Sequence, residues 1–288
     1  DAVRWPYAFF AVLLLQQALW IRMTALPEPA HEGTGVKSSA WRYPQLRRGM
    51  LAIFCYVGAE VAIGSLIINY LGLADMLGLP ERSAKHYLSL YWGGAMTGRF
   101  LGALALSTGI PVLRRGALML LTGAGMFGLL FAINAGDRFE LQHMWPMAVL
   151  VLANMGAFLL AGPSATRALG LFATIAAGLL GITALTSGAL ALWAIVAIGL
   201  FNSIMWSNIF TLAIDGLGDD TPQGSSLLVM MIVGGALIPP LQGLLIDVMK
   251  RAGHADQGFH LSFLLPLLCY AYLAWYGFRG SRHSHVAA

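Results

Sequence analysis

The stretch ALALWAIVAIGLFNSIMWSNIFTLAI (189–214) contains no Asp, Glu, Lys or Arg from one end to the other. A helix needs about 20 predominantly apolar residues to cross the hydrocarbon core of a bilayer. Its backbone must be hydrogen-bonded internally, which leaves helices and closed barrels, and barrel strands would alternate polar and apolar residues. This run is continuous and apolar, so it predicts a transmembrane helix.

The rest of the chain follows the same pattern. Of its 288 residues, 58% are hydrophobic and only 10% are charged, whereas soluble domains carry about 25% charged residues. The chain is therefore expected to be an all-α integral membrane protein with about nine transmembrane segments. These lie at 5–26, 49–73, 87–108, 116–134, 145–162, 169–185, 189–214, 226–248 and 259–278.

The longest polar stretch, PEPAHEGTGVKSSAWRYPQLRR (27–48), reads as a linker between helical blocks because it contains Pro, Gly, Ser and several basic residues. Its basic residues predict a cytoplasmic position, since loops on that side are enriched in Lys and Arg. Nine spans then place residues 281–288 in the cytoplasm as a tail. The same orientation puts further basic residues inside: Arg114, Arg115, Arg167, Arg279 and Arg282.

Several function classes are disfavoured. The net charge of +4 comes from bases in short connections, so no nucleic-acid partner is expected. Cys55 and Cys269 lie inside apolar runs and read as small buried hydrophobes. No H-E-x-x-H, G-x-S-x-G or Walker motif is present. We therefore expect no catalytic residues, no metal site and no cofactor.

Two charged residues inside apolar runs are candidates for function, because charges in a membrane are costly. Glu60 is about 11 residues into its segment, near the middle of the membrane. It could accept hydrogen bonds from sugar hydroxyls, or it could be a structural residue bonded to a neighbouring helix. Arg99 could form a gating or interdomain salt bridge, or its side chain could reach the membrane interface.

Three uncharged residues are further candidates for binding substrate. Asn202 and Trp206 are four residues apart, which would place them on one helix face. An amide beside an indole suits a sugar, because the amide binds hydroxyls and the ring covers the apolar face of the pyranose. Gln242 follows Pro239 and Pro240 and could act similarly. For Asn202 and Gln242 the alternative is an amide that joins two helices.

Several stretches resemble the fucose/glucose/galactose:proton symporters of the major facilitator superfamily, particularly the glucose/galactose branch. The resemblance covers about half of the chain, in the order found in the family. The matching stretches are YVGAEVAIGSLIINY (56–70), YWGGAMTGRFLGA (91–103), AIGLFNSIM (197–205), IFTLAIDGLG (209–218), QGSSLLVMMIVGGALIPPLQGLLID (223–247) and LPLLCYAYLAWYGFRGSR (265–282).

The resemblance implies a domain arrangement. Residues 1–26 would be the last helix of the N-terminal bundle, 27–48 the central cytoplasmic loop and 49–280 the C-terminal transmembrane bundle. Most of the N-terminal bundle, with the carboxylates thought to couple protons, would then precede Asp1 in the same polypeptide. Two features depart from the family. The family reads close to FNSIMFPTIF where this chain has FNSIMWSNIF (201–210), and residues 135–185 have room for an extra helical hairpin.

The resemblance thus implies a secondary active transporter of a hexose such as glucose, galactose or fucose. It would be coupled to protons, work by alternating access, and lie in the inner or plasma membrane. Two alternatives remain open: a polytopic membrane enzyme, and a sugar sensor that has the transporter fold but does not transport.

Overall fold

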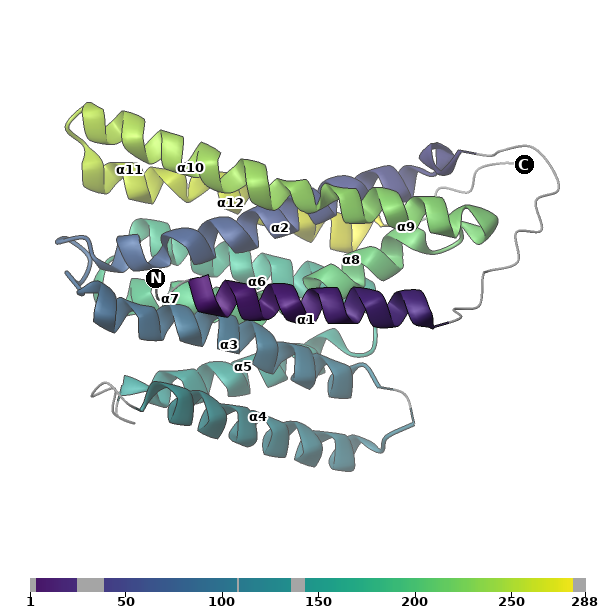
Figure 1. Ribbon diagram of the computed structural model, residues 1–288. Coiled ribbons are helices and arrows are strands. Elements are labelled where there is room, and N and C mark those ends of the chain that lie inside the picture. The colour runs from purple at the N-terminus through teal and green to yellow at the C-terminus, as the bar shows by residue number, and fades with distance from the viewer. Residues whose placement is uncertain (1–3, 25–38, 108, 136–142, 282–288) are drawn as a thin grey trace. The chain divides into compact units, whose positions relative to one another are not determined.

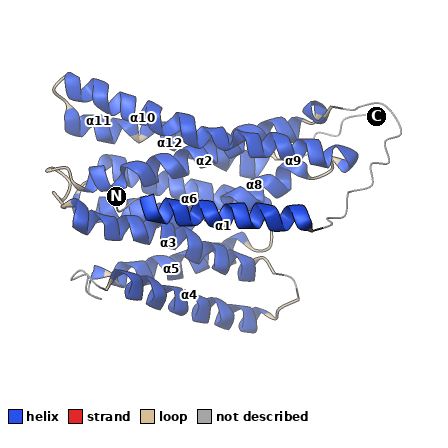
Figure 2. Ribbon diagram, in the orientation of Figure 1, coloured by secondary structure: helices blue, strands red, loops and turns tan. Residues whose placement is uncertain are grey.

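The computed structural model describes residues 4–24, 39–107, 109–135 and 143–281, and every regular element in these ranges is helical (Figure 2). The all-α prediction is therefore confirmed for the described part of the chain. Most of the predicted linker and all but the first residue of the predicted tail lie outside the described residues.

The helices agree with the apolar segments to within a few residues, and several segments are divided into consecutive helices. In chain order they are α1 (Arg4–Met23), η1 (Ala40–Arg42), α2 (Pro44–Leu71), α3 (Glu81–Ala105), α4 (Val112–Asn134), α5 (Trp145–Ala161), α6 (Ala165–Leu185), α7 (Gly188–Asn202), α8 (Met205–Ile214), η3 (Gly218–Asp220), α9 (Thr221–Met230), η4 (Met231–Val233), α10 (Gly234–Arg251), α11 (Ala255–Ser262), α12 (Leu264–Trp275) and the π-helical turn η5 (Tyr276–Gly280).

Six helical stretches among the described residues are long and apolar enough to cross a membrane. This set marks a multi-pass helical membrane protein. α5 is also apolar but has only 17 residues, and α3 begins with the charged sequence ERSAK. The six stretches are Pro44–Leu71, Val112–Asn134, Ala165–Leu185, Gly188–Ile214, Gly218–Arg251 and Gln257–Gly280.

The chain divides into two units, residues 1–38 and residues 39–288. Within the larger unit, α2 is central and packs against α3, α8, α10 and α12, while α7 packs against α3 and α6 (Figure 1). Glycines allow two of these close approaches. A Cβ on Gly199 would collide with the carbonyl of Tyr91, and one on Gly234 would collide with the carbonyl of Phe54. Backbones in direct contact are typical of membrane bundles.

The helices α4 and α5 form an outer layer of the larger unit. α4 contacts α3 and α5, and α5 in turn contacts α3, α6 and α7 (Figure 1). Their outward side chains are apolar, with Leu121 and Leu160 strongly exposed, as expected for a surface that faces lipid. By contrast, α6 packs against α7 and α12 inside the bundle.

Residues Ser39–Tyr43, just before α2, are tied to the connection between α8 and α9. Arg42 forms an ion pair of 3.4 Å with Asp220, and the hydroxyl of Tyr43 donates to the carbonyl of Leu217 at 3.5 Å. The amide of Ala40 donates to Oε1 of Gln223 at 2.8 Å. The hydrogen bond that Arg42 donates to Tyr43 raises the pKa of Arg42, so this attachment stays charged at physiological pH.

Candidate functional site

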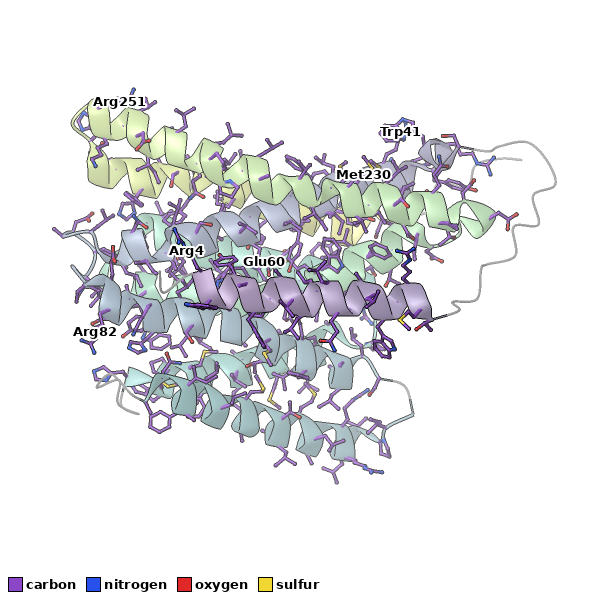
Figure 3. All side chains as sticks on the ribbon, viewed as in Figure 1. Arg4, Trp41, Glu60, Arg82, Met230 and Arg251 are labelled. Carbon is purple, nitrogen blue, oxygen red and sulfur yellow. The ribbon has the colours of Figure 1, made fainter. Side chains whose placement is uncertain are left out.

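Glu60 is the buried acid at the centre of the site, in the middle of α2 (Figure 3). Tyr56, one turn earlier, donates its hydroxyl to Oε1 of Glu60 at 2.9 Å. Nη2 of Arg99, on α3, lies 3.7 Å from the same oxygen. The side chain of Glu60 is 10% exposed and that of Arg99 is 57% exposed. The costly charge within the bundle is therefore compensated by one neutral and one cationic donor.

Arg99 also lines a cavity of about 520 Å³. This volume is within the usual range for small-molecule sites. Arg99 and Ser203 provide hydrogen-bond donors, and Trp206 provides an aromatic wall. The hydroxyl of Ser207 donates to the carbonyl of Ile204 at 3.1 Å and can accept a further hydrogen bond. The lining residues are Arg99, Gly102, Ala103, Leu106, Ser203, Ile204, Trp206 and Ser207. The arrangement suits a neutral polar molecule that also has an apolar face.

An interruption of the helix shapes one side of this cavity. α7 ends at Asn202 and α8 begins at Met205, so Ser203 lies at the break. Gly98 of α3 allows the close approach, because a Cβ there would collide with the side chain of Ser203. The hydroxyl of Ser203 is buried and has no hydrogen-bond partner among the described residues. It is therefore available to a ligand in the cavity that it lines.

The indole of Trp206 has two aromatic neighbours. Its ring lies 6.5 Å from that of Tyr56 and is stacked on that of Phe210 at 6.4 Å, with an interplanar angle of 24°. Such contacts restrict the ring without burying it completely. The flat, partly exposed indole can cover the apolar face of a sugar.

Asn202 does not line the cavity that Trp206 lines, although their spacing predicts a shared helix face. It is completely buried, its Nδ2 donates to the hydroxyl of Tyr91 at 3.0 Å, and its Oδ1 accepts from Tyr270 at 2.8 Å. Tyr91 donates onward to the carbonyl of Glu60 at 3.0 Å. The expectation assumed an unbroken helix. In the structure the break separates the two residues, and Asn202 joins α3, α7 and α12.

Gln242 also lies away from the cavity. It is fully buried on α10, and its Nε2 donates to Oγ of Ser262 on α11 at 3.0 Å. Neither residue lines the cavity beside Arg99. Of the five predicted site residues, the structure brings Glu60, Arg99 and Trp206 together. The two amides, Asn202 and Gln242, form hydrogen bonds between helices instead.

Three residues of the site were not anticipated from the sequence. Tyr56 had a usable signal, because it precedes Glu60 by four residues and so shares its helix face. Ser203 and Ser207 had none, since their positions depend on where α7 ends and on the glycines of α3. Among the described residues there is no group of three or more His, Cys, Asp or Glu that could hold a metal ion.

Comparison with known proteins points consistently to sugar transporters, although no family model matches. The chain is 36% identical to the "Glucose/galactose transporter" of Brucella abortus biovar 1 (strain 9-941), over 98% of this chain and 54% of the relative. It is 31% identical to a "Putative glucose/galactose transporter" of Helicobacter pylori (strain J99), over 97% and 54%. It is 27% identical to the "L-fucose-proton symporter" of Escherichia coli (strain K12), over 94% and 50%.

A solved structure gives the same result. A crystal structure of the E. coli fucose:proton symporter FucP matches this fold with a TM-score of 0.61 and 27% sequence identity, over 98% of this chain and 56% of that one. The chain thus spans about half the length of the curated relatives and of the solved structure that it matches.

Proposed function

We infer from these comparisons that the chain belongs to the fucose/glucose/galactose symporter family of the major facilitator superfamily, and from this premise we propose that it is part of a proton-coupled hexose transporter. The relatives named above are transporters of glucose and galactose or symporters of fucose and protons. We propose a transport role and no enzymatic one, in the inner or plasma membrane.

The observation that supports a hexose as substrate is the composition of the larger cavity. A hexose has hydroxyls that need donors and acceptors, and a ring face that is apolar. Arg99 and Ser203 can donate hydrogen bonds, and Ser207 can accept one. Trp206 can stack on the ring face, and the carboxylate of Glu60 lies against Arg99. We propose that these residues form this bundle's share of the sugar site, with Glu60 and Arg99 also serving in gating.

We further propose that α2 to η5 form the C-terminal bundle of the transporter. The central cytoplasmic loop would end at residue 43 and not at residue 48, because α2 begins at Pro44. In alternating access two bundles rock against each other around a site near the middle of the membrane. A second bundle of the same polypeptide would face the cavity beside Arg99. The sequence places an extra hairpin within residues 135–185, where the helices are α5 and α6. Because α4 and α5 form the outer layer while α6 packs inside, we propose instead that the extra hairpin begins earlier, at Val112, and consists of α4 and α5.

Uptake of radiolabelled glucose and galactose tests this function, with the natural reading frame that contains this chain expressed in cells that lack hexose transporters. We expect uptake that a protonophore abolishes. Trp206→Ala should reduce the uptake at low sugar concentration about tenfold. Trp145→Ala is the matched control, because Trp145 is exposed and lies outside the cavity, and it should transport like the parent.

Two outcomes would contradict the proposal. Normal expression of a properly folded protein with no uptake of any hexose would argue against transport. If that protein nevertheless bound hexose, it would be a sensor built on the transporter fold.

A further inference from the structure

A second, smaller cavity lies where α3 leads into α4 and where α5 leads into α6. Its volume is about 50 Å³ and it shares no lining residue with the larger cavity. The connection from α3 to α4 is at the right of Figure 1. The cavity is lined by Ala105, Arg115, Met119, Phe158, Leu159, Gly162 and Pro163.

One guanidinium group lines this cavity, and a second lies beside one of the other lining residues. Arg115 is one of the lining residues, and its Nη1 donates a long hydrogen bond of 3.5 Å to the carbonyl of Ala105. Nη2 of Arg167 lies 3.5 Å from where a Cβ on Gly162 would be, and Gly162 is also in the lining. In the described part of the chain, no carboxylate is within salt-bridge distance of either arginine. The site therefore carries two positive charges that the described carboxylates do not neutralise.

The start of α6 adds to this positive potential. α6 has 21 residues, and its N-cap Ser164 accepts a hydrogen bond from the amide of Arg167. The other amides of the first turn have no partner within the helix, so this end attracts negative charge. With the two guanidinium groups, the helix end provides a built site for an anion.

The other wall of the cavity is apolar and continues onto the outer surface. Met119, Phe158 and Leu159 line it, and Leu159 is 66% exposed while its neighbour Leu160 is 78% exposed. A cavity of about 50 Å³ exceeds the volume of one water, about 30 Å³, but is far smaller than the cavity beside Arg99. It suits a compact anionic group attached to an apolar chain, and a soluble anion would leave the apolar wall unused.

We propose that this site binds an anionic phospholipid. Its phosphate would lie between Arg115 and Arg167 at the start of α6, and an acyl chain would run along Leu159 on the surface of α5. The proposed orientation places both arginines at the cytoplasmic leaflet, where anionic lipids attract basic residues. Zwitterionic phospholipids carry no net charge and should bind less tightly.

Binding to the purified chain in neutral detergent tests this proposal, with native mass spectrometry as the measurement. Phosphatidylglycerol should bind at least about tenfold more tightly than phosphatidylcholine with the same acyl chains. The double substitution Arg115→Gln and Arg167→Gln should abolish this preference, because charge-assisted bonds to the phosphate are lost. The matched control is Lys250→Gln with Arg251→Gln, at the far end of α10 (Figure 3), and it should keep the preference.

Three results would overturn the proposal: equal binding of the two lipids, an unchanged preference in the double variant, or displacement of the lipid by millimolar inorganic phosphate. The last result would assign the site to a soluble anion. If the double variant does not fold, Arg167→Gln alone decides the matter, because Arg167 is exposed. This single variant should bind phosphatidylglycerol several-fold more weakly than the parent.

Discussion

The carboxylate of Glu60 is held by a tyrosine and an arginine from two helices, and it lies next to a cavity of substrate size. If a sugar hydroxyl donates to this carboxylate, the charge-assisted hydrogen bond contributes about 1.5–3 kcal/mol to binding, roughly twice as much as a neutral one. Glu60→Gln should therefore lower hexose affinity about tenfold, since 1.4 kcal/mol corresponds to that factor. Tryptophan fluorescence or calorimetry on the complete protein would measure it.

The control for this prediction is Glu81→Gln, the same exchange at the exposed start of α3. It should leave the affinity unchanged. A properly folded Glu60→Gln variant that binds hexose like the parent would mean that Glu60 serves only to hold α2 and α3 together.

Asn202 leads to a prediction about stability. Its substitution by Ala removes a donor to Tyr91 and an acceptor for Tyr270, and leaves these hydroxyls buried. An unsatisfied buried polar group costs about 1–3 kcal/mol, so Asn202→Ala should lower the melting temperature by several degrees. Asn69→Ala is the control, because Asn69 is exposed. Equal melting temperatures for the two variants would contradict the joining role of Asn202.

Glu60 and Asn202 show how much the sequence can predict about single residues. A carboxylate in the middle of an apolar run stands out because any such charge needs a partner or a function, and Glu60 has a described partner in Arg99. An amide gives a weaker signal, because membrane helices use amides both for ligands and for each other. The partners of Asn202 come from positions 91 and 270, and only the fold brings them together.

At the scale of helices, packing of α3 against α7 depends on Gly199. A methyl group there would meet the carbonyl of Tyr91, and backbone cannot move aside as a flexible side chain can. Gly199→Ala should therefore destabilise the protein by about 1–3 kcal/mol, the usual cost of overpacking. Gly178→Ala on α6 is the matched control, because open space surrounds that position, and there Ala should be neutral or stabilising by up to about 1 kcal/mol. Thermal unfolding in detergent would measure the stability of both variants, and equal stabilities would contradict this prediction.

The positions of the helices were largely predictable, because each apolar run had to be helical to satisfy its backbone in lipid. Their internal breaks were not. The run 189–214 has no proline and no charge to mark the end of α7 at Asn202. Ser203, directly after that end, lies close to Gly98 of α3, and this contact is a property of the packed bundle.

At the scale of the whole molecule, the direction of the helices in the membrane remains a prediction from the basic loops. Asp219 and Lys250 lie at opposite ends of the helices α9 and α10, and both are exposed. With the cytoplasmic end at Asp219, a cysteine in place of Lys250 should react with an impermeant maleimide added to intact cells. One in place of Asp219 should react only after permeabilisation. The native Cys55 and Cys269 are buried and should give little background, and the reverse pattern would invert the topology.

The family was predictable from short matching stretches spread along the chain, and the comparisons confirm it. The identity of the proposed substrate is harder to predict, because it would depend on a few contacts in a cavity. Two residues that line the cavity beside Arg99, Trp206 and Ser207, are where the sequence departs from the family pattern.

The hydrogen bonds of Asn202 also have a consequence for biosynthesis. The residue enters the membrane with α7, while its partner Tyr270 is 68 positions later and is translated after it. Until α12 inserts, the amide oxygen of Asn202 lacks this donor, and an unsatisfied polar group in hydrocarbon is costly. Final closure of the bundle therefore has to wait until α12 has been translated and inserted. A truncated chain that ends before Leu264, and so lacks α12, should remain loosely packed and be degraded quickly by membrane proteases.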